Sequence, residues 1–573
     1  MTHENLMQMI FQIIVCSSCP YKEQFFETIA NLLQRYCALF LETLRIRLKV
    51  IIMKRFCSGI NRKLKQTCAV YIMVSLFVLF LLFWHLGAPS VNATDEAYHG
   101  VNAYEMLKSG NWLVNTYQNE VDYFNSKPPL NLWLIILSYK IFGVSQFALR
   151  FPAALAGGGI YFVLSAYLWK RKSARTAILF GLAFMTNVLP LTYHGFRSGD
   201  MDGMFALFFT IAMLALAEIK RHPNAVIAYG FVVGLAFLTK SVHAGTIVVI
   251  GIMYLPVIRK KLSVKKIMLA GLAAVLPVMA WAIPRYLYDG MMFFSHGIAG
   301  EMSDKITVGQ VGDITYPIRL MMLQKNWQLL VICLVIAVLF WAETKRIRYI
   351  ENTKCTANGK PDQRLQGSAG RFLDRYYLLL CATLVPMLLY VAVQAHSEWY
   401  YYPCYLGGNV AAALMAEYVL KHLKVITLRR IYSLGYAAAC VVVGVHVARE
   451  IYVSDISGDP NVLLRNCIQA EKTDWGETYS GCTAYIENVE NSYKNQDEWQ
   501  CNDVFLAETI MDWSCENGGV AAFLEEADNA SVSADHPCVL IISGSLWDQY
   551  SSVLTGHVIL QDNEYLILSS EMY

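Results

Sequence analysis

Residues 225–258 read AVIAYGFVVGLAFLTKSVHAGTIVVIGIMYLPVI, which is two apolar runs separated by a short turn that holds Lys240. Each run approaches the length of about 20 residues with which a helix crosses the hydrocarbon of a bilayer. Lys240 is the only lysine, arginine, aspartate or glutamate in the stretch. The stretch therefore predicts two helices that cross a membrane and are joined by a turn at its surface.

Runs of the same kind recur along the chain, and the composition agrees with them. The 573 residues are 56% hydrophobic and only 16% charged, whereas about a quarter of a soluble domain is charged. With a mean hydropathy of +0.38, these figures exclude a disordered chain and argue against an ordinary soluble globule. The net charge of +3 gives no support to nucleic-acid binding.

We therefore predict an α-helical polytopic membrane protein of about 11–13 spans. The apolar runs lie near residues 68–87, 149–169, 176–193, 203–219, 225–239, 242–258, 267–287, 324–342, 376–395, 400–420 and 431–448. A further run, 130–143, is too short to span, and we expect it to lie as a helix in the membrane interface.

Basic residues alternate between dense and sparse loops. Six loops carry 28 lysines and arginines, and the loops between them carry isolated ones only. The dense loops are 54–65, 170–175, 220–221, 259–266, 345–375 and 421–430. Because cytoplasmic loops hold the excess of lysine and arginine, we place the N-terminal side in the cytoplasm of a multi-pass plasma-membrane protein. The extracytoplasmic segments are then the loops 88–148 and 288–322, the turn 396–399 and the tail after residue 448.

These patterns predict three parts. Residues 1–66 form a cytoplasmic N-terminal segment, residues 67–448 a membrane-embedded body, and residues 449–573 an acidic extracytoplasmic domain. Met53 precedes a basic stretch and the first span. Residues 1–52 are therefore either a mis-assigned start or a cytoplasmic interfacial helix.

The tail differs from the body in charge. From Arg449 to Tyr573 there are four lysines and arginines against 22 aspartates and glutamates, a net charge of −18, while the preceding residues carry +21. Apolar segments at 538–543, 558–560 and 565–568 predict strands, and Ser545–Leu554 predicts a helix. We expect a small α/β domain beside the outer loops.

The cysteines of this exported tail point to disulfide bonds. They are Cys467, Cys482, Cys501, Cys515 and Cys538. Exported domains commonly hold disulfides, and because five is odd, at least one cysteine pairs elsewhere or stays reduced. No two of them have the two-residue spacing of a zinc site. No metal site is predicted, and a divalent metal remains an open cofactor that ligand spacing does not indicate.

The loop 88–148 carries the first candidate catalytic residues. Asp95 and Glu96 follow the first span directly, before a predicted helix at 98–107 and an extended piece at Asn111–Val114. A carboxylate at this place can take a proton from an incoming hydroxyl. The alternative is a solvated loop in which Asp95 only caps the next helix.

The same loop ends on Tyr123-Phe-Asn-Ser-Lys127-Pro-Pro. The two prolines fix the backbone after Lys127 and help to aim its side chain. A lysine presented in this way can neutralise the phosphate of a lipid head group.

Further polar side chains lie at other outer ends of the spans. They are Arg197, Asp202, Lys240, His296, Glu301, His396 and Tyr400. Ionisable residues near the membrane are functional candidates by default. The alternatives are that Asp202 caps the span beginning near Gly203, that Lys240 reaches lipid phosphate as an anchor, and that Tyr400 belongs to an aromatic belt.

These groups converge on one side of the membrane under the predicted topology. The seven that do so are Asp95, Lys127, Arg197, Asp202, Lys240, His296 and Tyr400. A single outer cavity that all seven residues line explains their common side better than seven unrelated surface positions do.

Several of these motifs follow one another in the order of a known family. They are Asp95-Glu96, Glu105–Trp112 (EMLKSGNW), Lys127-Pro-Pro-Leu130, Leu132-Trp133 and Phe147–Leu155 (FALRFPAAL). Over residues 68–448 the chain resembles the GT-C-fold glycosyltransferases that use polyprenyl-phosphate sugars. It resembles in particular the bacterial lipid A aminoarabinose transferases and the protein O-mannosyltransferase-like group.

The resemblance implies roles for single residues. Asp95 is similar to the family's essential aspartate, and Asp202 matches its second acidic position. Catalytic roles are thus expected for Asp95, Asp202 and Glu96, donor-phosphate binding for Lys127, Tyr400, Lys240 and Arg197, and acceptor or accessory roles for Tyr123, His296, Glu301 and His396. Departures from the pattern, such as Ser-Val after Lys240 and His396 in place of a lysine, leave the sugar open.

The expected function is transfer of a sugar from a polyprenyl-phosphate donor to an extracytoplasmic lipid, glycan or protein acceptor, with inversion. Lys127 and Tyr400 would neutralise the departing phosphate, and Asp95 with Asp202 would position or deprotonate the acceptor. A hydroxyl acceptor needs this base, and a phosphate acceptor does not. The alternative is a flippase or transporter of a lipid-linked glycan, which polar groups at the outer ends rather than along the spans disfavour.

Overall fold

The computed structural model describes most of the chain. The described residues are 62–88, 91, 95–125, 127–299, 363–391, 397–454, 482–487, 498–530, 538–543, 546–554, 558–561 and 565–569. The chain divides into two compact units, Met1–Met73 and Val74–Tyr573. The predicted span 324–342 and residues 1–52 lie outside the described residues.

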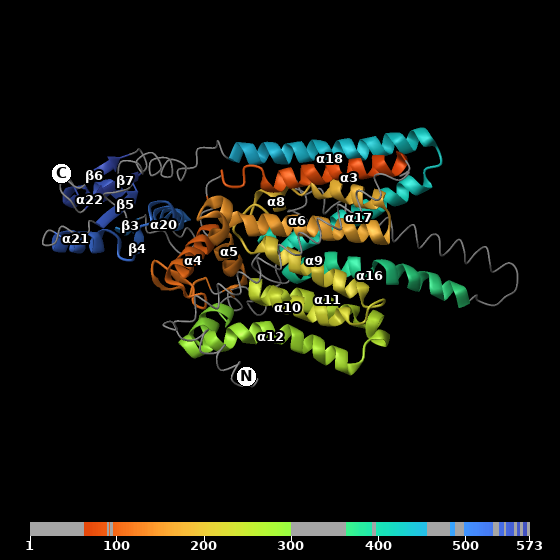
Figure 1. Cartoon of the computed structure of the whole chain (residues 1–573), viewed down its shortest axis with the longest axis horizontal. Coiled ribbons are helices and arrows are strands. Elements are labelled where there is room, and N and C mark those ends of the chain that lie inside the picture. Colours follow the sequence, from red (N-terminus) through yellow and green to blue (C-terminus); the bar gives the residue numbers. More distant parts are fainter. Residues whose placement is uncertain are drawn as a thin grey trace. The chain divides into compact units, whose positions relative to one another are not determined.

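Apolar helices make up most of the second unit (Figure 1). They are α6 (Gln146–Arg171), α7 (Ala174–Phe184), α8 (Val188–Thr192), α9 (Asp202–Glu218), α10 (Ala225–Lys240), α11 (Gly245–Ile258), α12 (Val264–Asp289), α16 (Gln363–Val391), α17 (Tyr402–His422) and α18 (Ile426–Ser454), while α3 (Arg62–Phe83) begins in the first unit. Among the described residues, five helical stretches are long and apolar enough to cross a membrane: Leu64–Phe83, Gln146–Arg171, Ala225–Lys261, Val264–Asp289 and Ile426–Val453. The prediction of a multi-pass helical membrane protein is confirmed.

Some helices differ from the predicted runs in their ends. The short run 130–143 is a helix, α5 (Leu130–Phe142), of 13 residues. The run 176–193 is broken into α7 and α8. α18 continues to Ser454, so the predicted domain boundary at residue 448 falls inside a helix.

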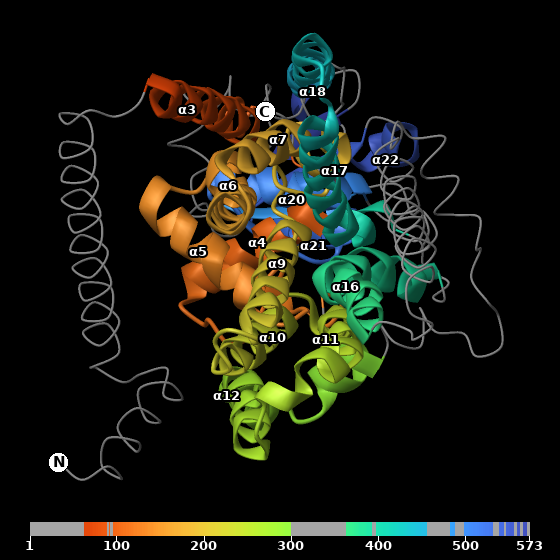
Figure 2. The same ribbon diagram turned by 90° about the vertical axis from the view of Figure 1, so that its right-hand side faces the viewer.

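The helices around α9 form the frame of the body. α9 packs between α6 and α10, and α10 packs on α12; Figure 2 looks along these helices and shows the four in a row. A Cβ on Gly230 would lie 2.0 Å from the carbonyl oxygen of Ala270, and one on Gly234 would lie 2.4 Å from that of Ala274. Glycine at these two positions lets α10 and α12 approach closely, as is common between membrane helices.

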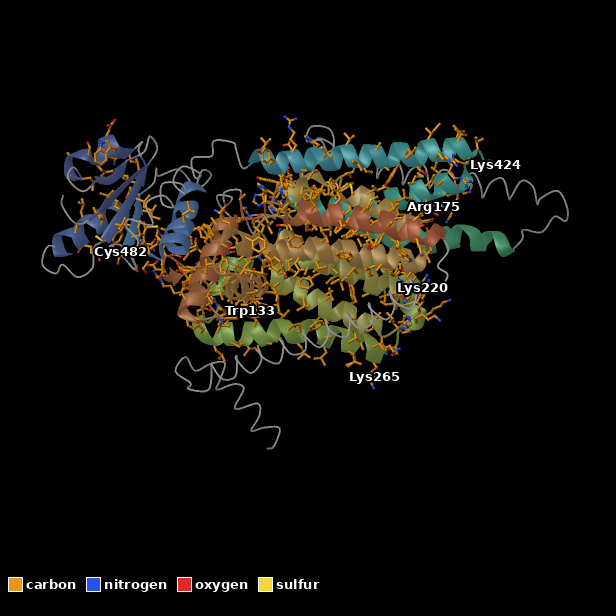
Figure 3. The ribbon with its side chains drawn as sticks, turned by 45° about the horizontal axis from the view of Figure 1, so that its top comes forward. Trp133, Arg175, Lys220, Lys265, Lys424 and Cys482 are labelled. Carbon is orange, nitrogen blue, oxygen red and sulfur yellow. The ribbon has the colours of Figure 1, made fainter. Side chains whose placement is uncertain are left out.

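Basic residues gather at one end of these helices. Figure 3 shows Arg175, Lys220, Lys265 and Lys424 at that end, away from Trp133 of α5. All four belong to loops or helix ends that the sequence counts among the dense basic ones. Four of the six dense basic loops therefore lie at one end of the helical body, as the predicted topology requires.

The first outer loop folds into α4 (Asp95–Ser109), a hairpin and α5. The hairpin pairs β1 (Thr116–Tyr117) with β2 (Glu120–Val121). Its turn residues, Gln118 and Asn119, have φ of 52° and 60°, as a tight two-residue hairpin turn requires.

The helix predicted at 98–107 is confirmed and begins earlier, at Asp95. The extended piece predicted at Asn111–Val114 is wrong, because the segment bends. The side-chain oxygen of Asn111 accepts hydrogen bonds from the backbone N–H groups of Leu113 and Val114, at 3.1 and 3.4 Å. Such a side-chain turn competes with a strand.

The tail folds into a small α/β domain, as predicted. Its sheet has the order β4-β3-β5-β7-β6, in which β3 is parallel to β4 and β5, and β7 is antiparallel to β5 and β6. The strands are β3 (Thr483–Glu487), β4 (Ser514–Glu516), β5 (Cys538–Ser543), β6 (Val558–Gln561) and β7 (Tyr565–Ser569), and the helices are α20 (Glu498–Met511), α21 (Gly519–Ala530) and α22 (Trp547–Leu554). Cys482, Cys515 and Cys538 are buried in this domain; Cys467 lies outside the described residues, so the disulfides remain a prediction.

The tail packs on the first outer loop through α4 and α20. The Tyr104 hydroxyl donates to Asp512 at 2.6 Å, and the amide of Asn119 donates to the carbonyl oxygen of Cys515 at 3.0 Å. A Cβ on Gly100 would lie 2.5 Å from the ring of Phe505, so this glycine makes room for that ring. Residues of both elements share one hydrophobic core.

Two buried carboxyl groups meet in this contact. Glu105 of α4 and Glu508 of α20 are 5% and 2% exposed, and their carboxyl groups lie close enough to influence each other's pKa. Burial raises the pKa of Glu508 well above its ordinary value of 4.5, and the Glu105 carboxyl raises it further. The folded protein therefore holds a proton that the unfolded chain releases, and stability falls as the pH rises above 4.5 towards the pKa of folded Glu508.

We predict that Glu508→Gln stabilises the tail at pH 8 and has little effect at pH 4.5, because glutamine donates to Glu105 without holding a titrating proton. The expected gain is about 1 kcal/mol, and thermal unfolding followed by the fluorescence of the buried Trp513 measures it. Glu525→Gln, at an exposed position of α21, is the matched control. An unchanged or lower unfolding midpoint at pH 8 would contradict the raised pKa of Glu508 in the folded protein.

Candidate active site

One cavity of about 140 Å³ collects residues from five separate segments. Its lining is Asp95, His99, Lys127, Asp200, Met201, Asp202, Lys240, Trp399 and Tyr400. They come from α4, the segment before α5, the start of α9 with its preceding turn, the end of α10, and the short helix Glu398–Tyr401 before α17. Five predicted residues, Asp95, Lys127, Asp202, Lys240 and Tyr400, are thus brought together.

Asp95 and Lys127 form the accessible pair of the cavity. The lysine Nζ lies 3.9 Å from Asp95 Oδ1, and the lysine and aspartate side chains are 22% and 42% exposed. Burial alone would raise the pKa of Asp95, but the positive charge of Lys127, with His99 and His194, lowers it below the ordinary value. Asp95 is therefore a carboxylate at neutral pH that a molecule in the cavity can reach.

Asp202 and Lys240 form a buried pair behind it. The Lys240 ammonium donates to Asp202 Oδ1, and the lysine and aspartate side chains are only 5% and 9% exposed. The same ammonium lies 4.7 Å from the ring centre of Tyr400, a cation–π distance. The chain leaves α10 directly afterwards, where Ser241 has a φ of 34°.

This geometry argues against the three alternatives that the sequence left open for Asp202, Lys240 and Tyr400. The N-cap of α9 is Met201, and Asp202 is the first helical residue with its side chain on Lys240. Lys240 is buried, so it is no anchor to lipid phosphate. Tyr400 is also buried, within a cluster of tyrosines around Tyr390 and Tyr401.

Asp200 holds a histidine pair at the back of the cavity. His194 Nδ1 lies 2.7 Å from Asp200 Oδ2, and His99 Nδ1 lies 3.8 Å from Asp200 Oδ1. Although burial lowers the pKa of His194, Asp200 raises it to about 9, and His194 in turn lowers the pKa of Asp200. Burial, with the charge of Lys127, lowers the pKa of His99 to about 4. At neutral pH His194 is thus a cation and His99 is neutral.

The loop that carries His194 is strained. His194 has a φ of 44°, which is costly for a residue other than glycine, and a Cβ on the following Gly195 would lie 2.3 Å from the carbonyl oxygen of Pro190. The imidazole stacks on Trp399 with 4.2 Å between ring centres. Strain of this kind concentrates at functional sites.

Sequence reasoning missed His99, Asp200, His194 and Trp399. A signal existed for His99, because it follows Asp95 by four residues and so lies one turn further on the same face of a helix; the predicted helix began too late to show this. A signal existed for Asp200 too, because it stands two residues before Asp202 in the same short acidic segment. Nothing in the sequence connected His194 or Trp399 with the site.

Glu96 lies away from the cavity, in a buried ion pair. Arg150 of α6 donates to both of its carboxylate oxygens, at 2.7 and 3.0 Å, and the backbone N–H of Gly199 donates to Oε1 at 2.7 Å. Glu96 is fully buried and Arg150 is 2% exposed. These contacts tie the start of α4 to α6 and to the loop before α9.

Three other predicted residues, Arg197, Tyr123 and His296, do not line the cavity. Arg197 donates to the backbone oxygens of Leu81 and Leu82, both at 3.0 Å, and so closes the end of a helix. The rings of Tyr123 and His296 face each other at 5.8 Å between centres. Glu301 and His396 lie outside the described residues.

A cation could find ligands at one corner of the site. Ligand atoms of Asp95, His194 and Asp200 lie within 4.8 Å of one another. His194 already supplies a positive charge to Asp200, and Lys127 supplies one to Asp95. A metal would have to displace the proton of His194, which the raised pKa opposes.

A family model and curated relatives match the central part of the chain. Residues 126–283 match the family described as dolichyl-phosphate-mannose-protein mannosyltransferase. An uncharacterized protein of Aquifex aeolicus is 30% identical over 189 residues, which are 32% of this chain and 36% of that protein. An undecaprenyl phosphate-alpha-4-amino-4-deoxy-L-arabinose arabinosyl transferase of Pectobacterium atrosepticum is 30% identical over 234 residues, 39% of this chain and 40% of the relative. The matches thus span less than half the length of these relatives.

The likeness in structure covers far more of the chain. The crystal structure of ArnT from Cupriavidus metallidurans, bound to undecaprenyl phosphate, superposes with a TM-score of 0.61 at 14% identity, over 88% of this chain and 98% of ArnT. At this identity the likeness shows the fold. The chain therefore shares the fold of ArnT, which is the GT-C fold that the sequence predicts.

Proposed function

We propose that this protein transfers a sugar from a polyprenyl-phosphate donor to an extracytoplasmic acceptor, with inversion at the anomeric carbon. The observation that carries the proposal is the cavity in which the accessible pair Asp95–Lys127 stands beside the buried pair Asp202–Lys240. The relatives support the donor class, since one is named an undecaprenyl-phosphate arabinosyl transferase and ArnT was solved with undecaprenyl phosphate.

Lys127 is the side chain that meets the donor phosphate. It is partly exposed, and its ion pair with the Asp95 carboxylate has the long distance of 3.9 Å. A phosphate that enters the cavity can exchange for this weak contact at little cost. Lys240 is held by Asp202 and supports the Tyr400 ring, so it contributes positive potential and positions Tyr400.

Donor binding would activate Asp95. While Lys127 faces Asp95, it lowers the pKa of that carboxyl. A phosphate bound to Lys127 draws this charge away and adds its own negative charge, so the pKa of Asp95 rises and its carboxylate becomes a stronger base. A hydroxyl acceptor then loses its proton to Asp95 as it attacks the anomeric carbon, and the lipid phosphate leaves towards Lys127.

The buried groups keep these atoms in place. Asp200 with His194 fixes the loop before α9, and Glu96 with Arg150 fixes the start of α4, so the carboxylate of Asp95 is presented at a constant place. Glu96 is thus a positioning residue, not a catalytic one. A phosphate acceptor would need Asp95 only for orientation, and the nature of the acceptor and of the sugar stays open.

We predict that Asp95→Asn lowers transfer to a hydroxyl acceptor by about 100-fold or more, because asparagine keeps the shape and loses the base. Donor binding should stay within a few-fold of wild type. The measurement is transfer of labelled sugar from a purified polyprenyl-phosphate donor into membrane products. Full activity of Asp95→Asn would exclude it as the base, and lipid translocation without transfer by the wild type would favour a transporter.

Glu96→Gln is the companion variant to Asp95→Asn. It removes one member of a buried ion pair, which costs about 3–5 kcal/mol, so we expect a lower unfolding temperature and a smaller yield. Asp95→Asn should unfold at the wild-type temperature. A stable but inactive Glu96→Gln would mean that Glu96 is the catalytic carboxylate.

We predict that Lys127→Ala abolishes detectable transfer and weakens binding of undecaprenyl phosphate, because the cavity then keeps its carboxylates and loses the accessible cation. The binding is measured on purified protein in detergent. Lys108→Ala is the control, since Lys108 is an exposed lysine of the same loop that contacts Asp512 instead. Undiminished turnover in Lys127→Ala would exclude the phosphate contact.

We also predict that the cavity and the tail are extracytoplasmic, as the basic loops at the opposite end indicate. An alkaline phosphatase fused after Ser454, the end of α18, should be active, because the enzyme works only outside the cytoplasm. A fusion after Lys261, in a basic loop at the other end, should be inactive. The reverse pattern would invert the proposed sidedness.

A further inference from the structure

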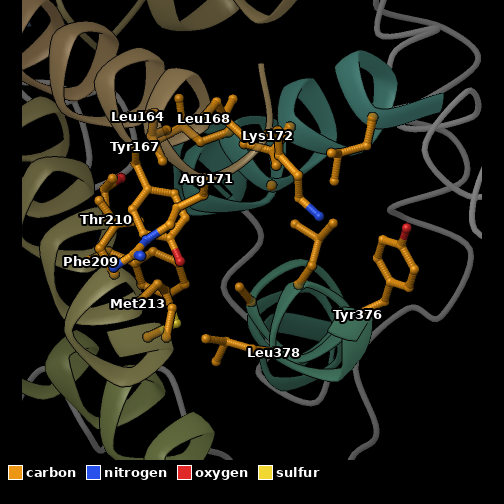
Figure 4. Close-up of a pocket in the computed structure, with 18 of the residues that line it drawn as sticks. Leu164, Tyr167, Leu168, Arg171, Lys172, Phe209, Thr210, Met213, Tyr376 and Leu378 are labelled. Atoms are coloured by element: carbon orange, nitrogen blue, oxygen red, sulfur yellow. The ribbon is translucent and has the colours of Figure 1, made fainter. Parts of the chain in front are cut away.

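A second and larger cavity opens among the helices of the body. Its volume is about 680 Å³, within the usual range of about 300–1,000 Å³ for ligand pockets. None of the residues that line it lines the candidate active site. Figure 4 shows that α6, α9 and α16 contribute to its walls.

Most of its wall is apolar. Its apolar side chains come from α6, α9, α16 and α17, among them Leu164, Met213, Leu379 and Val410. Along α9 the lining runs from Phe209 to the residues just after the helix, a distance of about 18 Å at 1.5 Å per residue. One leaflet of a bilayer has about 15 Å of hydrocarbon, so the cavity can take the chain of a lipid in that leaflet.

Four basic residues line the same cavity: Arg171, Lys172, Lys220 and Arg221. They lie at or just after the C-terminal ends of α6 and α9, at the end of the body where Lys265 and Lys424 also lie (Figure 3). The positive-inside pattern explains basic residues at this end. It does not explain why four of them line a deep apolar cavity.

One carboxylate partly balances these charges. Glu218 accepts hydrogen bonds from Arg171 and from Arg221, the latter at 3.2 Å. Among the described residues, the Nε of Arg171 is buried without a hydrogen-bond partner. Within the described part of the chain, the four basic side chains outnumber this one carboxylate, and the basic rim that they form also holds the buried Nε of Arg171; both features suit an anionic oxygen.

We propose that this cavity binds an anionic phospholipid of the leaflet at the basic end, with the phosphate at Lys172, Lys220 and the two arginines and an acyl chain between α9 and α17. Basic pockets between membrane helices at the cytoplasmic side are suited to such head groups. The phosphate would complete the hydrogen bonding of Arg171 and neutralise the rim. The proposal does not depend on the glycosyltransferase activity.

The test titrates phosphatidylglycerol, phosphatidylcholine with the same acyl chains, or inorganic phosphate into the full-length protein in detergent. Native mass spectrometry counts bound lipid, and thermal unfolding reports stabilisation, because a ligand of the folded state raises the unfolding temperature. We expect saturable binding and a raised midpoint with phosphatidylglycerol alone. Equal effects of phosphatidylcholine, or an equal effect of inorganic phosphate, would overturn the proposal.

Variants locate the binding. Lys172→Gln with Lys220→Gln should weaken phosphatidylglycerol binding by about 10-fold or more, whereas Lys265→Gln with Lys424→Gln, outside the cavity lining at the same end, should not. Val410→Trp should fill the cavity and also remove the bound lipid. If both double variants lose phosphatidylglycerol binding equally, the lipid is held by general attraction to the basic surface, and the proposed site is wrong.

Two other occupants have their own signatures. If Val410→Trp weakens binding of undecaprenyl phosphate and the lysine pair has no effect on phosphatidylglycerol, the cavity holds the donor's tail. If a photo-reactive residue at position 414 cross-links to residues 324–342 and no lipid binds, that segment of the chain fills the cavity. Either result overturns the lipid site.

Discussion

The buried ion pair between Glu96 and Arg150 is the constraint on which the active-site geometry depends. Arg150 holds both oxygens of the carboxylate and also donates to the backbone oxygen of Leu86, while Gly199 donates its N–H to Glu96. Segments that are far apart in the chain therefore meet at one carboxylate. Because Asp95 precedes Glu96 and Asp200 follows Gly199, the pair brings both aspartates to the same cavity.

A pair as buried as this is not obviously stabilising, since the loss of hydration opposes the attraction. The ion pair instead fixes the position of the residues at the start of α4. A misplacement of about 1 Å can cost a reaction a factor of about 100, and the two hydrogen bonds from Arg150 hold the start of α4 against α6. In the proposed mechanism, the adjacent acids Asp95 and Glu96 therefore have different roles: Asp95 carries the chemistry and Glu96 positions it.

Charge in the cavity is arranged by depth. Each carboxylate has a cationic partner: Asp95 has Lys127, Asp202 has Lys240, and Asp200 has His194. The two inner pairs are buried and close, and the outer pair is longer and partly exposed. Under the proposed function, a donor phosphate would therefore meet the pair that is easiest to separate, while the inner charges would stay fixed and need no reorganisation.

The amino-acid sequence by itself determined the class of fold and much of the site. Apolar run length fixes which segments can cross a bilayer, because a span must satisfy its backbone internally over a set thickness, and the described runs became helices, most with ends shifted by a few residues. Three strands of the tail, β5, β6 and β7, and its helix at 547–554 followed from short apolar segments between turns, whereas the sequence did not predict β3 and β4. Asp95, Lys127, Asp202, Lys240 and Tyr400 were recognisable from charge at span ends and from motif order.

Only the tertiary structure decided how those residues divide their roles. Glu96 and Asp95 are equivalent in the sequence, and the partner that separates them, Arg150, comes 54 residues later. His194 lies in a strained loop and Trp399 in a short turn, where their rings stack on each other. No local sequence pattern predicts either position. These roles depend on burial, on the distance to a charged group and on contacts between distant segments. All three are properties of the folded chain and not of residues that are adjacent in the sequence.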